Sequence, residues 1–573
     1  MNVVSKQPIP QDQLELSYFD LWEKMTAPYA DLPALKFPAA NAQFTFAETK
    51  SEAERLARAI SHLWNELVPE PLTGDEADPK ALFCLPIPVP SVMMVMKLAF
   101  TKLGITTYAV SHLQMAKMGQ EYIDNGKAQI VFIPDAILQD QQMATALATH
   151  VSQSAAQCVV ILSPYDYTPA QYPDASKFAP LFPNKLVLVT SDLLKHDQGI
   201  EVPVNSTTHI PAIYNTSGTT GQPKGIKVPI TRAASLYNAY LAHPVLAALK
   251  AGSDFFVTIP MHHPTANEHC VTVPWLFGCT LYLQPKYDKE QFPTDLTKLG
   301  PDATAMVAPE HAFQLLECDL TEGSLSHIAC LQIGGSPITP AVMARLTAKC
   351  KWLGIQHLLF GYGTSEDGPM TFLSTGNLDD NQLELMPVDG VEYRIVDEDG
   401  NPVKMGELGQ LQIKSNERTF LGYYTRPDLD AETFIENGEW RAVGDVLEEI
   451  RPGVVLIHDR FKYSFVVDGE RHFLYPLRNA LTVCEAIIEA EAVKLNLSHH
   501  VMTGHVTMKE DTDRAIAYAE IMQACADLPV VERPANIAFV DEFETNFETG
   551  KRLKEHLPEK FDGYGINGDI SFH

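Results

Sequence analysis

The stretch Ile213 to Gly225, IYNTSGTTGQPKG, has the composition of an anion-binding loop. It follows an extended segment and combines three glycines, four hydroxyl-bearing residues and one lysine. Glycines let the backbone approach an anion closely, and backbone N–H groups and hydroxyls can then surround phosphate oxygens while Lys224 adds positive charge. The stretch does not fit the GxxxxGK[ST] pattern of a Walker A loop. The ordered arrangement favours phosphate binding over a flexible surface loop.

Further short motifs follow this loop in a fixed order. Four of the six contain glycine, and most carry one or two chemically active side chains. They occupy positions 260–263 (PMHH), 334–337 (GGSP), 361–366 (GYGTSE), 439–445 (EWRAVGD), 459–462 (DRFK) and 546–551 (NFETGK). The set resembles the motifs of the adenylate-forming superfamily, which contains acyl-CoA synthetases, firefly luciferases and the adenylation domains of peptide synthetases. The resemblance covers nearly the whole chain.

The resemblance implies a nucleotide site. Tyr362 is expected to stack on adenine, because aromatic faces pair well. Asp445 is expected to accept hydrogen bonds from both ribose hydroxyls, and Arg460 to contact ribose or phosphate. The residues that the resemblance assigns to nucleotide binding are Thr216, Ser217, Gly218, Thr219, Thr220, Gly221, Lys224, Gly335, Ser336, Pro337, Gly361, Tyr362, Gly363, Thr364, Ser365, Asp445, Arg460 and Lys551.

The resemblance also implies catalytic and metal-binding roles. Lys551 matches the catalytic lysine near the C-terminus, His263 borders the expected carboxylate pocket, and Thr219 belongs to the phosphate loop. Glu366 is expected to bind Mg²⁺, a hard cation that prefers oxygen ligands, with Thr216 as the second residue near the metal. The four expected catalytic residues are therefore Lys551, His263, Thr219 and Glu366.

The chain departs from the family pattern at two places. The segment Trp440 to Asp445 keeps the tryptophan and the Gly-Asp end but changes the middle, which leaves the role of Arg441 open. Val466 stands where many members have lysine, six residues after Arg460, and this weakens the expectation of thioester formation and of luciferase-like oxidation. Lys462 occupies the hinge position.

The reaction that the resemblance implies is ATP-dependent activation of a carboxylic acid as an acyl-adenylate, with release of pyrophosphate. The acyl group would then pass to a thiol, either of coenzyme A or of the phosphopantetheine arm of an acyl carrier protein. Two alternatives remain: an aryl-acid or amide-forming ligase, and a nucleotide-binding protein without turnover. Because binding alone requires neither Glu366 nor Lys551, their presence argues against the last.

The identity of the acid rests on weaker signals. Pro264 stands where enzymes for α-amino acids place an aspartate, and a buried ammonium without a partner is costly. Glu268 keeps an amine-bearing substrate open, although a solvated or helix-capping role is the simpler interpretation. A set of apolar residues near the inferred pocket favours a fatty acid over a polar one. These residues are Val271, Val273, Trp275, Leu276 and Val307.

Composition limits the broad class of protein. The 573 residues include 43 Lys+Arg and 72 Asp+Glu, a formal net charge of −29, which excludes a basic nucleic-acid footprint. The nine cysteines form no CxxC pair, which argues against a zinc ribbon and favours reduced thiols. The N-terminus lacks the features of a signal peptide, and prolines interrupt the most apolar stretch, so we expect a cytoplasmic protein without a membrane span.

Alternating strands and helices must position these residues. Buried strands are predicted at 129–133, 158–162 and 185–190, and helices at 51–67 and 92–103, a pattern typical of parallel sheets covered by helices. After residue 385 the predicted elements at 391–397, 409–415 and 454–458 are strands joined by turns. We therefore predict a large α/β body with a β-rich annex over residues 1–461, followed by a small mobile α+β domain over 462–573.

Overall fold

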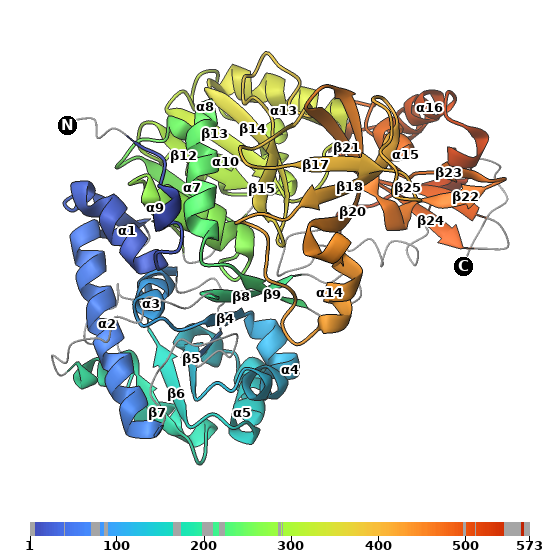
Figure 1. Ribbon diagram of the computed structural model, residues 1–573. Helices are drawn as coiled ribbons and strands as arrows, with labels where there is room; N and C mark the ends of the chain where they lie inside the picture. Colours follow the sequence, from blue (N-terminus) through green and yellow to red (C-terminus); the bar gives the residue numbers. More distant parts are fainter. Residues whose placement is uncertain are drawn as a thin grey trace.

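The computed structural model describes residues 6–38, 41–69, 81–84, 90–163, 173–197, 210–216, 224–284, 288, 290–496, 500–509, 512–543 and 563–565. Two large sheets form the body of the molecule, and a β-rich annex and a small C-terminal unit follow along the chain (Figure 1). The predicted α/β class, with a large N-terminal and a small C-terminal domain, is confirmed. No helix among these residues combines the length and the apolar character that crossing a membrane requires.

The first sheet contains the strand that leads into the expected phosphate loop. Its strands are parallel except for the last, and α2 (Phe46–Leu67), α3 (Pro90–Lys102), α4 (His112–Asn125) and α5 (Gln141–Gln153) belong to this part of the chain (Figure 1). In spatial order the described strands are β7 (Leu186–Val189), β6 (Cys158–Leu162), β5 (Ile130–Pro134), β3 (Ala81–Cys84), β4 (Thr107–Val110), β8 (Ala212–Thr216) and β9 (Lys224–Val228).

The second sheet has a parallel centre with antiparallel strands at both edges. Ligands of such sheets bind beyond the carboxyl ends of the parallel strands, which is where β13 and β14 deliver the second and third glycine-rich motifs. The described strands, in spatial order, are β16 (Met386–Pro387), β15 (Gly368–Leu373), β14 (His357–Thr364), β13 (Ile328–Gly334), β12 (Ala303–Val307), β10 (Asp254–Val257), β11 (Thr280–Leu283), β1 (Pro33–Phe37) and β2 (Ala42–Thr45).

The annex and the small C-terminal unit complete the described chain. The annex is built from β17 (Tyr393–Val396), β18 (Leu408–Lys414), β19 (Phe434–Ile435), β20 (Trp440–Arg451) and β21 (Val454–Arg460). The C-terminal unit contains the hairpin β22 (Phe465–Val467) and β23 (Glu470–His472), a sheet of β24 (Ile487–Asn496), β25 (His500–Met508), β26 (Pro534–Phe539) and β27 (Gly563–Gly565), and the helices α15 (Tyr475–Leu481) and α16 (Arg514–Cys525).

The C-terminal unit contacts the body through α13 (Pro340–Leu353) and the loop before it. The guanidinium of Arg345 donates to the carbonyl oxygens of Glu485 and Ile487 at 2.6 and 2.8 Å, and the hydroxyls of Thr482 and Thr339 lie 2.7 Å apart. Two of these contacts use main-chain carbonyls, so they fix the position of the first strand of the C-terminal sheet rather than a particular side chain.

The segment after His263 is a rare local structure. Residues Thr265–Thr272 form η8, a π-helix, which leads directly into α9 (Val273–Leu276). Such turns often occur at functional sites. His269 on η8 is fully buried and lies 2.5 Å from Gln332 of β13, measured from Nε2 to Oε1. This contact ties the helix that follows His263 to the strand that ends at Gly334.

Burial lowers the pKa of His269 from 6.5 to about 4. A group whose folded-state pKa is depressed contributes stability above its unfolded pKa and loses it as the pH falls through the folded value. We therefore expect the free energy of unfolding to fall by up to roughly 3 kcal/mol on account of this residue as the pH falls from about 7 to 4.

Chemical denaturation at several pH values tests this expectation. His269→Gln should flatten the acid limb of the stability profile, because its side chain does not titrate. His357→Gln is the matched control, since His357 lies half-buried on β14 and its replacement leaves the His269–Gln332 contact intact. Equal acid slopes in the wild type and His269→Gln would contradict the assignment.

Candidate active site

Strands β8 and β9 form the base of the expected phosphate loop. They pair antiparallel, and Thr216 at the end of β8 lies opposite Lys224 at the start of β9. The Lys224 ammonium lies 5.5 Å from the centre of the Tyr423 ring. Residues 217–223, which include the predicted site residues Ser217, Gly218, Thr219, Thr220 and Gly221, lie outside the described residues, as does the side chain of Thr216.

Glu366 faces the base of this loop. Its carboxylate accepts a hydrogen bond of 2.8 Å from the Tyr423 hydroxyl, the same ring that lies under Lys224. Its main-chain oxygen accepts from the Phe420 amide at 2.7 Å and from Arg232 at 2.7 Å. Tyr423 thus links the loop and the predicted metal ligand. Burial is the main cause that raises the pKa of Tyr423, so the phenol stays protonated and donates.

Tyr362, Asp445 and Arg460 meet in one group. The Tyr362 hydroxyl donates to Asp445 Oδ2 at 2.5 Å, and the Arg460 guanidinium lies 3.0 Å from Asp445 Oδ1. Asp445 is buried, whereas Arg460 is exposed. The neighbouring Asp445 carboxylate raises the pKa of Arg460. The structure therefore brings together three residues that the sequence motifs place 83 and 15 positions apart, by the numbering of residues 362, 445 and 460.

The glycine motifs lie side by side at the ends of β13 and β14. Gly334 is paired with Gly361 in the parallel register, and Gly335, Ser336 and Pro337 continue directly from the end of β13. A Cβ atom on Gly363 would lie 2.4 Å from the carbonyl oxygen of Pro369, so only glycine fits. Gly335 has φ of +102°, a backbone conformation that favours glycine.

A buried ion pair supports this edge of the site. The Arg441 guanidinium is bonded to both carboxylate oxygens of Asp367, with Nε to Oδ1 at 2.8 Å, and it also donates to the Thr364 hydroxyl at 3.0 Å. Both charged side chains are almost fully buried. The sequence left the role of Arg441 open. In the structure this side chain connects β20 to the turn that carries Thr364, Ser365 and Glu366.

His263 lies at the turn before η8. Its backbone N–H donates to Pro260 O at 3.0 Å, and its ring Nδ1 accepts from the Thr265 amide at 3.2 Å. Because Nδ1 acts as an acceptor, the neutral imidazole carries its proton on Nε2. The first turn of η8 therefore fixes both the orientation and the tautomer of the ring.

Glu268 was expected to be solvated or to cap a helix, and this expectation is wrong. It is buried on η8, and its carboxylate lies 3.4 Å from the guanidinium of Arg232, which opens α7 (Arg232–Ala242). Arg232 also donates to the main-chain oxygens of Ser365 and Glu366, at 2.9 and 2.7 Å. Sequence reasoning missed Arg232, Tyr423 and Asp367, because nothing in the local sequence separates a buried charge or phenol from an exposed one.

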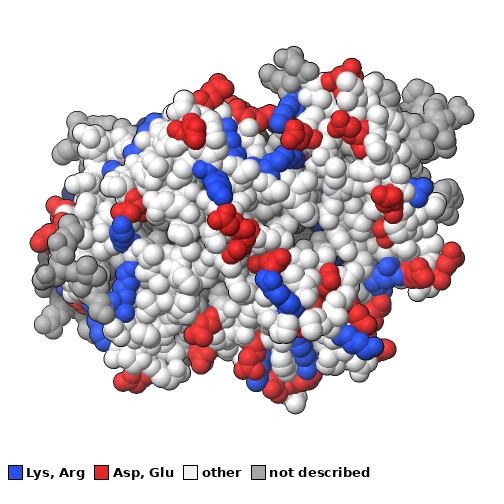
Figure 2. All heavy atoms as spheres, turned by 90° about the horizontal axis from the view of Figure 1, so that it is seen from above, with Lys and Arg blue, Asp and Glu red and all other residues white. Residues whose placement is uncertain are grey.

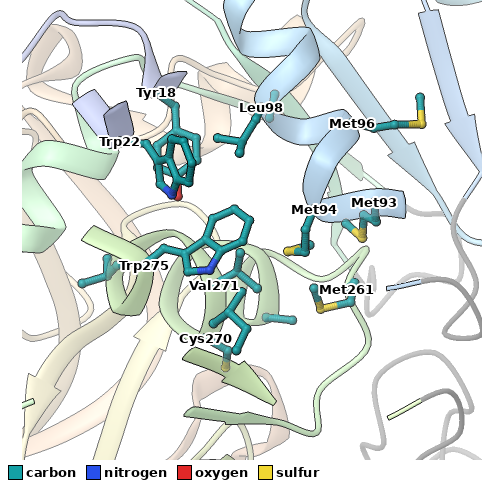
Figure 3. Close-up of a cluster of buried hydrophobic side chains, with 14 of the residues drawn as sticks. Tyr18, Trp22, Met93, Met94, Met96, Leu98, Met261, Cys270, Val271 and Trp275 are labelled. Carbon is teal, nitrogen blue, oxygen red and sulfur yellow. The ribbon is translucent and has the colours of Figure 1, made fainter. Parts of the chain in front are cut away.

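The apolar residues that were expected to line the acid pocket belong to the core. Val271, Trp275 and Leu276 pack with Trp22 and the methionines of α3, as Figure 3 shows for Val271 and Trp275. Val273 lies in the same cluster, and Val307 lies in the core of the second sheet. A cavity of about 60 Å³ does lie nearby, between α3, β8 and η8, but none of the five residues lines it.

The remaining predicted residues belong to the C-terminal part. Lys551 lies outside the described residues. Lys462 is exposed just after β21, and its ammonium lies 4.6 Å from the centre of the Tyr463 ring. Val466 is exposed on β22. The roles of these residues stay predictions.

Comparisons with known proteins identify a family and a fold. The family model described as AMP-binding enzyme matches residues 87–424. A long-chain-fatty-acid–CoA ligase from Yersinia pestis is 28% identical over 355 residues, 60% of this chain and 60% of the relative. A medium-chain fatty-acid–CoA ligase from Escherichia coli is 30% identical over 274 residues, 46% of each chain. The chain therefore matches about half of the length of these relatives.

Solved structures show the same fold over almost the entire chain. The anthranilate CoA ligase AuaEII, in complex with anthranoyl-AMP, superposes with a TM-score of 0.76 at 17% identity, covering 96% of this chain and 98% of that one. The order of the motifs, the shared fold and a family model that matches more than half of the sequence lead to one conclusion: this chain belongs to the family of AMP-binding enzymes.

Proposed function

We propose that this protein joins a fatty acid to coenzyme A, by way of an acyl-adenylate formed from ATP. The main observation behind the proposal is that Tyr362, Asp445 and Arg460 contact one another in one group. Glu366 follows Tyr362 by four residues, and its contact with Tyr423 links it to the base of the Gly/Ser/Thr-rich loop. The names of the relatives, at 28–30% identity, support a fatty acid and coenzyme A as the substrates.

In the first step an oxygen of the acid's carboxylate attacks the α-phosphorus of ATP. A bond from this oxygen to phosphorus forms, the bond from phosphorus to the bridging oxygen breaks, and pyrophosphate leaves. No protein nucleophile is required, so the protein contributes positioning and charge. Holding two reactants in the correct geometry can supply about 7–11 kcal/mol, and one preorganised donor about 3–4 kcal/mol. Lys551 and Lys224 are the proposed donors.

Glu366 is suited to hold the Mg²⁺ that accompanies ATP. Its carboxylate is half-buried, it offers oxygen, and among the described residues no cationic side chain lies within ion-pair distance of it. Magnesium prefers such oxygen ligands and neutralises phosphate charge when bound. Thr216, at the end of β8, is the proposed second residue near the metal.

In the second step the thiol of coenzyme A attacks the carbonyl carbon of the acyl-adenylate. A carbon–sulfur bond forms, the bond from carbon to the phosphate oxygen breaks, AMP leaves, and the thiol proton passes to solvent. Replacement of the mixed anhydride by a thioester needs no oxidant. The proposal thus requires only acid, ATP and thiol. Acid-dependent exchange of labelled pyrophosphate into ATP tests the first step, and thioester formation with coenzyme A, or an acyl carrier protein instead, tests the second.

Lys551→Ala should abolish pyrophosphate exchange while AMP still binds, because the lysine is proposed to stabilise charge that develops in the transition state. Exchange is measured with a fatty acid as substrate, and AMP binding by calorimetry. Lys554→Ala is the matched control, since it removes a lysine three residues away. Exchange at the wild-type rate in Lys551→Ala would remove this residue from the mechanism.

Asp445→Ala should raise the Kd for ATP by roughly ten- to a hundredfold, since hydrogen bonds to a charged group contribute about 1.5–3 kcal/mol. Asp445→Asn, which keeps an acceptor for Tyr362, should have an intermediate effect. Asp399→Ala, at an exposed position in the annex, should leave the Kd unchanged. An unchanged Kd in Asp445→Ala means that the ribose assignment is wrong.

A further inference from the structure

A cavity of about 60 Å³ lies between α3, β8, η8 and the start of α7. Its walls come from both halves of the body: Lys97 and Phe100 on α3, Ala212 and Tyr214 on β8, and Glu268 with Asn267 on η8. Arg232, which also donates to the carbonyl oxygens of Ser365 and Glu366, is part of the wall. Most of the remaining lining side chains are apolar, among them Met93, Ala109 and Val228.

Three charged side chains line this cavity, and their charges do not balance. Arg232 and Glu268 are almost fully buried and lie 3.4 Å apart. Lys97 comes from α3, and its ammonium donates to the Asn267 side chain and, at 2.5 Å, to the Thr272 hydroxyl. The same ammonium lies 4.7 Å from the centre of the Tyr18 ring. Two cations therefore accompany one carboxylate, and the other described lining residues carry no formal charge.

Burial makes this excess charge costly. A charge that leaves water without a full counter-charge loses its hydration without compensation. The same effect disfavours the charged form of Lys97, because burial lowers the pKa of this lysine to about 7. Burial also raises the pKa of Glu268, the one carboxylate among the described residues of the wall. An added anion would remove the imbalance, whereas an added amine would increase it and a hydrocarbon alone would leave it unchanged.

The cavity wall and the candidate active site share one side chain, Arg232. Arg232 donates to the carbonyl oxygens of Ser365 and Glu366 with the same guanidinium that contacts Glu268. Glu268 follows His263 by five residues and lies on η8, the helix that begins two residues after His263. A molecule whose carboxylate lies near His263 can therefore extend its other end toward Lys97.

We propose that this cavity binds the far end of the acid substrate, and that this end carries a second carboxylate. The substrate class would then be an α,ω-dicarboxylic acid, that is, a fatty acid oxidised at its far end. The inference rests on the proposed function. The apolar part of the wall would contact the methylene groups of the substrate. Its second carboxylate would supply the negative charge that balances the second cation of the Lys97 and Arg232 pair.

The wild-type enzyme tests this proposal without any substitution. Pyrophosphate exchange is measured with acids of four to twelve carbons in four matched series: unsubstituted, ω-hydroxy, ω-amino and α,ω-dicarboxylic. We expect kcat/KM for the best diacid to exceed that of the unsubstituted acid of equal length at least tenfold. An unsubstituted or ω-amino acid that performs equally well or better overturns the proposal while leaving the ligase function intact. If no acid of any series supports exchange, the proposed function itself fails.

Lys97→Met removes the charge and keeps a side chain of similar length. We expect it to lower kcat/KM for the diacid at least tenfold, to raise or preserve that for the unsubstituted acid, and to leave KM for ATP unchanged. Lys102→Met is the matched control, because Lys102 lies on the same helix but pairs with Glu54 outside the cavity. Thermal melting confirms that both variants fold. An unaltered ratio between the two acids in Lys97→Met contradicts the inference.

Discussion

The position of the candidate site depends on the Arg232 guanidinium. It donates through Nε to the carbonyl oxygen of Arg418 in the annex segment at 2.6 Å, and through its two terminal nitrogens to the carbonyls of Ser365 and Glu366 and to the carboxylate of Glu268. A buried guanidinium must satisfy its donors, because an unpaired one loses its hydration without compensation. One side chain therefore fixes α7, η8, the Glu366 turn and the annex relative to one another.

Arg441 repeats this arrangement on the opposite side of the same turn. Its ion pair with Asp367 and its bond to Thr364 hold the turn from β20, as Arg232 holds it from α7. Buried ion pairs give little net stability, but they specify geometry, since removing one partner leaves a charge without compensation. The turn that carries Ser365 and Glu366 is thus held between two arginines. A rigid turn suits residues that must be preorganised for charge developing during a reaction.

The overall charge of the molecule makes such local cations more important. Acidic and basic side chains are interspersed over the face seen in Figure 2, and the whole chain carries a net charge of −29. A surface of this kind favours solubility and does not attract anionic substrates. The proposed substrates, ATP and an organic acid, are both anions. Their binding would have to come from particular groups at short range, and Lys224, Arg460, Arg232 and Lys97 are among the cations that the structure places around the turn and the cavity.

The regular elements of this protein follow from its sequence more directly than its specificity does. The strand predicted at 158–162 has those bounds in β6, because five consecutive apolar residues identify a strand buried on both faces. The helix predicted from residue 51 begins earlier, at Phe46, because Thr45 and Glu48 form a capping box, a signal that was present in the sequence. The motifs assign Tyr362 and Asp445 to one nucleotide site, and in the structure the Tyr362 hydroxyl donates to Asp445.

The lining of the cavity beside η8 could not be predicted from the sequence, for a physical reason. Residues of η8 and α9 are buried on all sides, so their polarity does not tell which of them face the core and which face a cavity. The π-helix makes the cavity-facing residues still harder to identify, because its wider turn changes the helical spacing from which a face is inferred. The apolar members of the segment fill the core, and the polar Asn267, Glu268 and Thr272 face the cavity. A segment that is apolar on average thus presents its few polar groups to the cavity, so its average polarity does not describe the cavity wall.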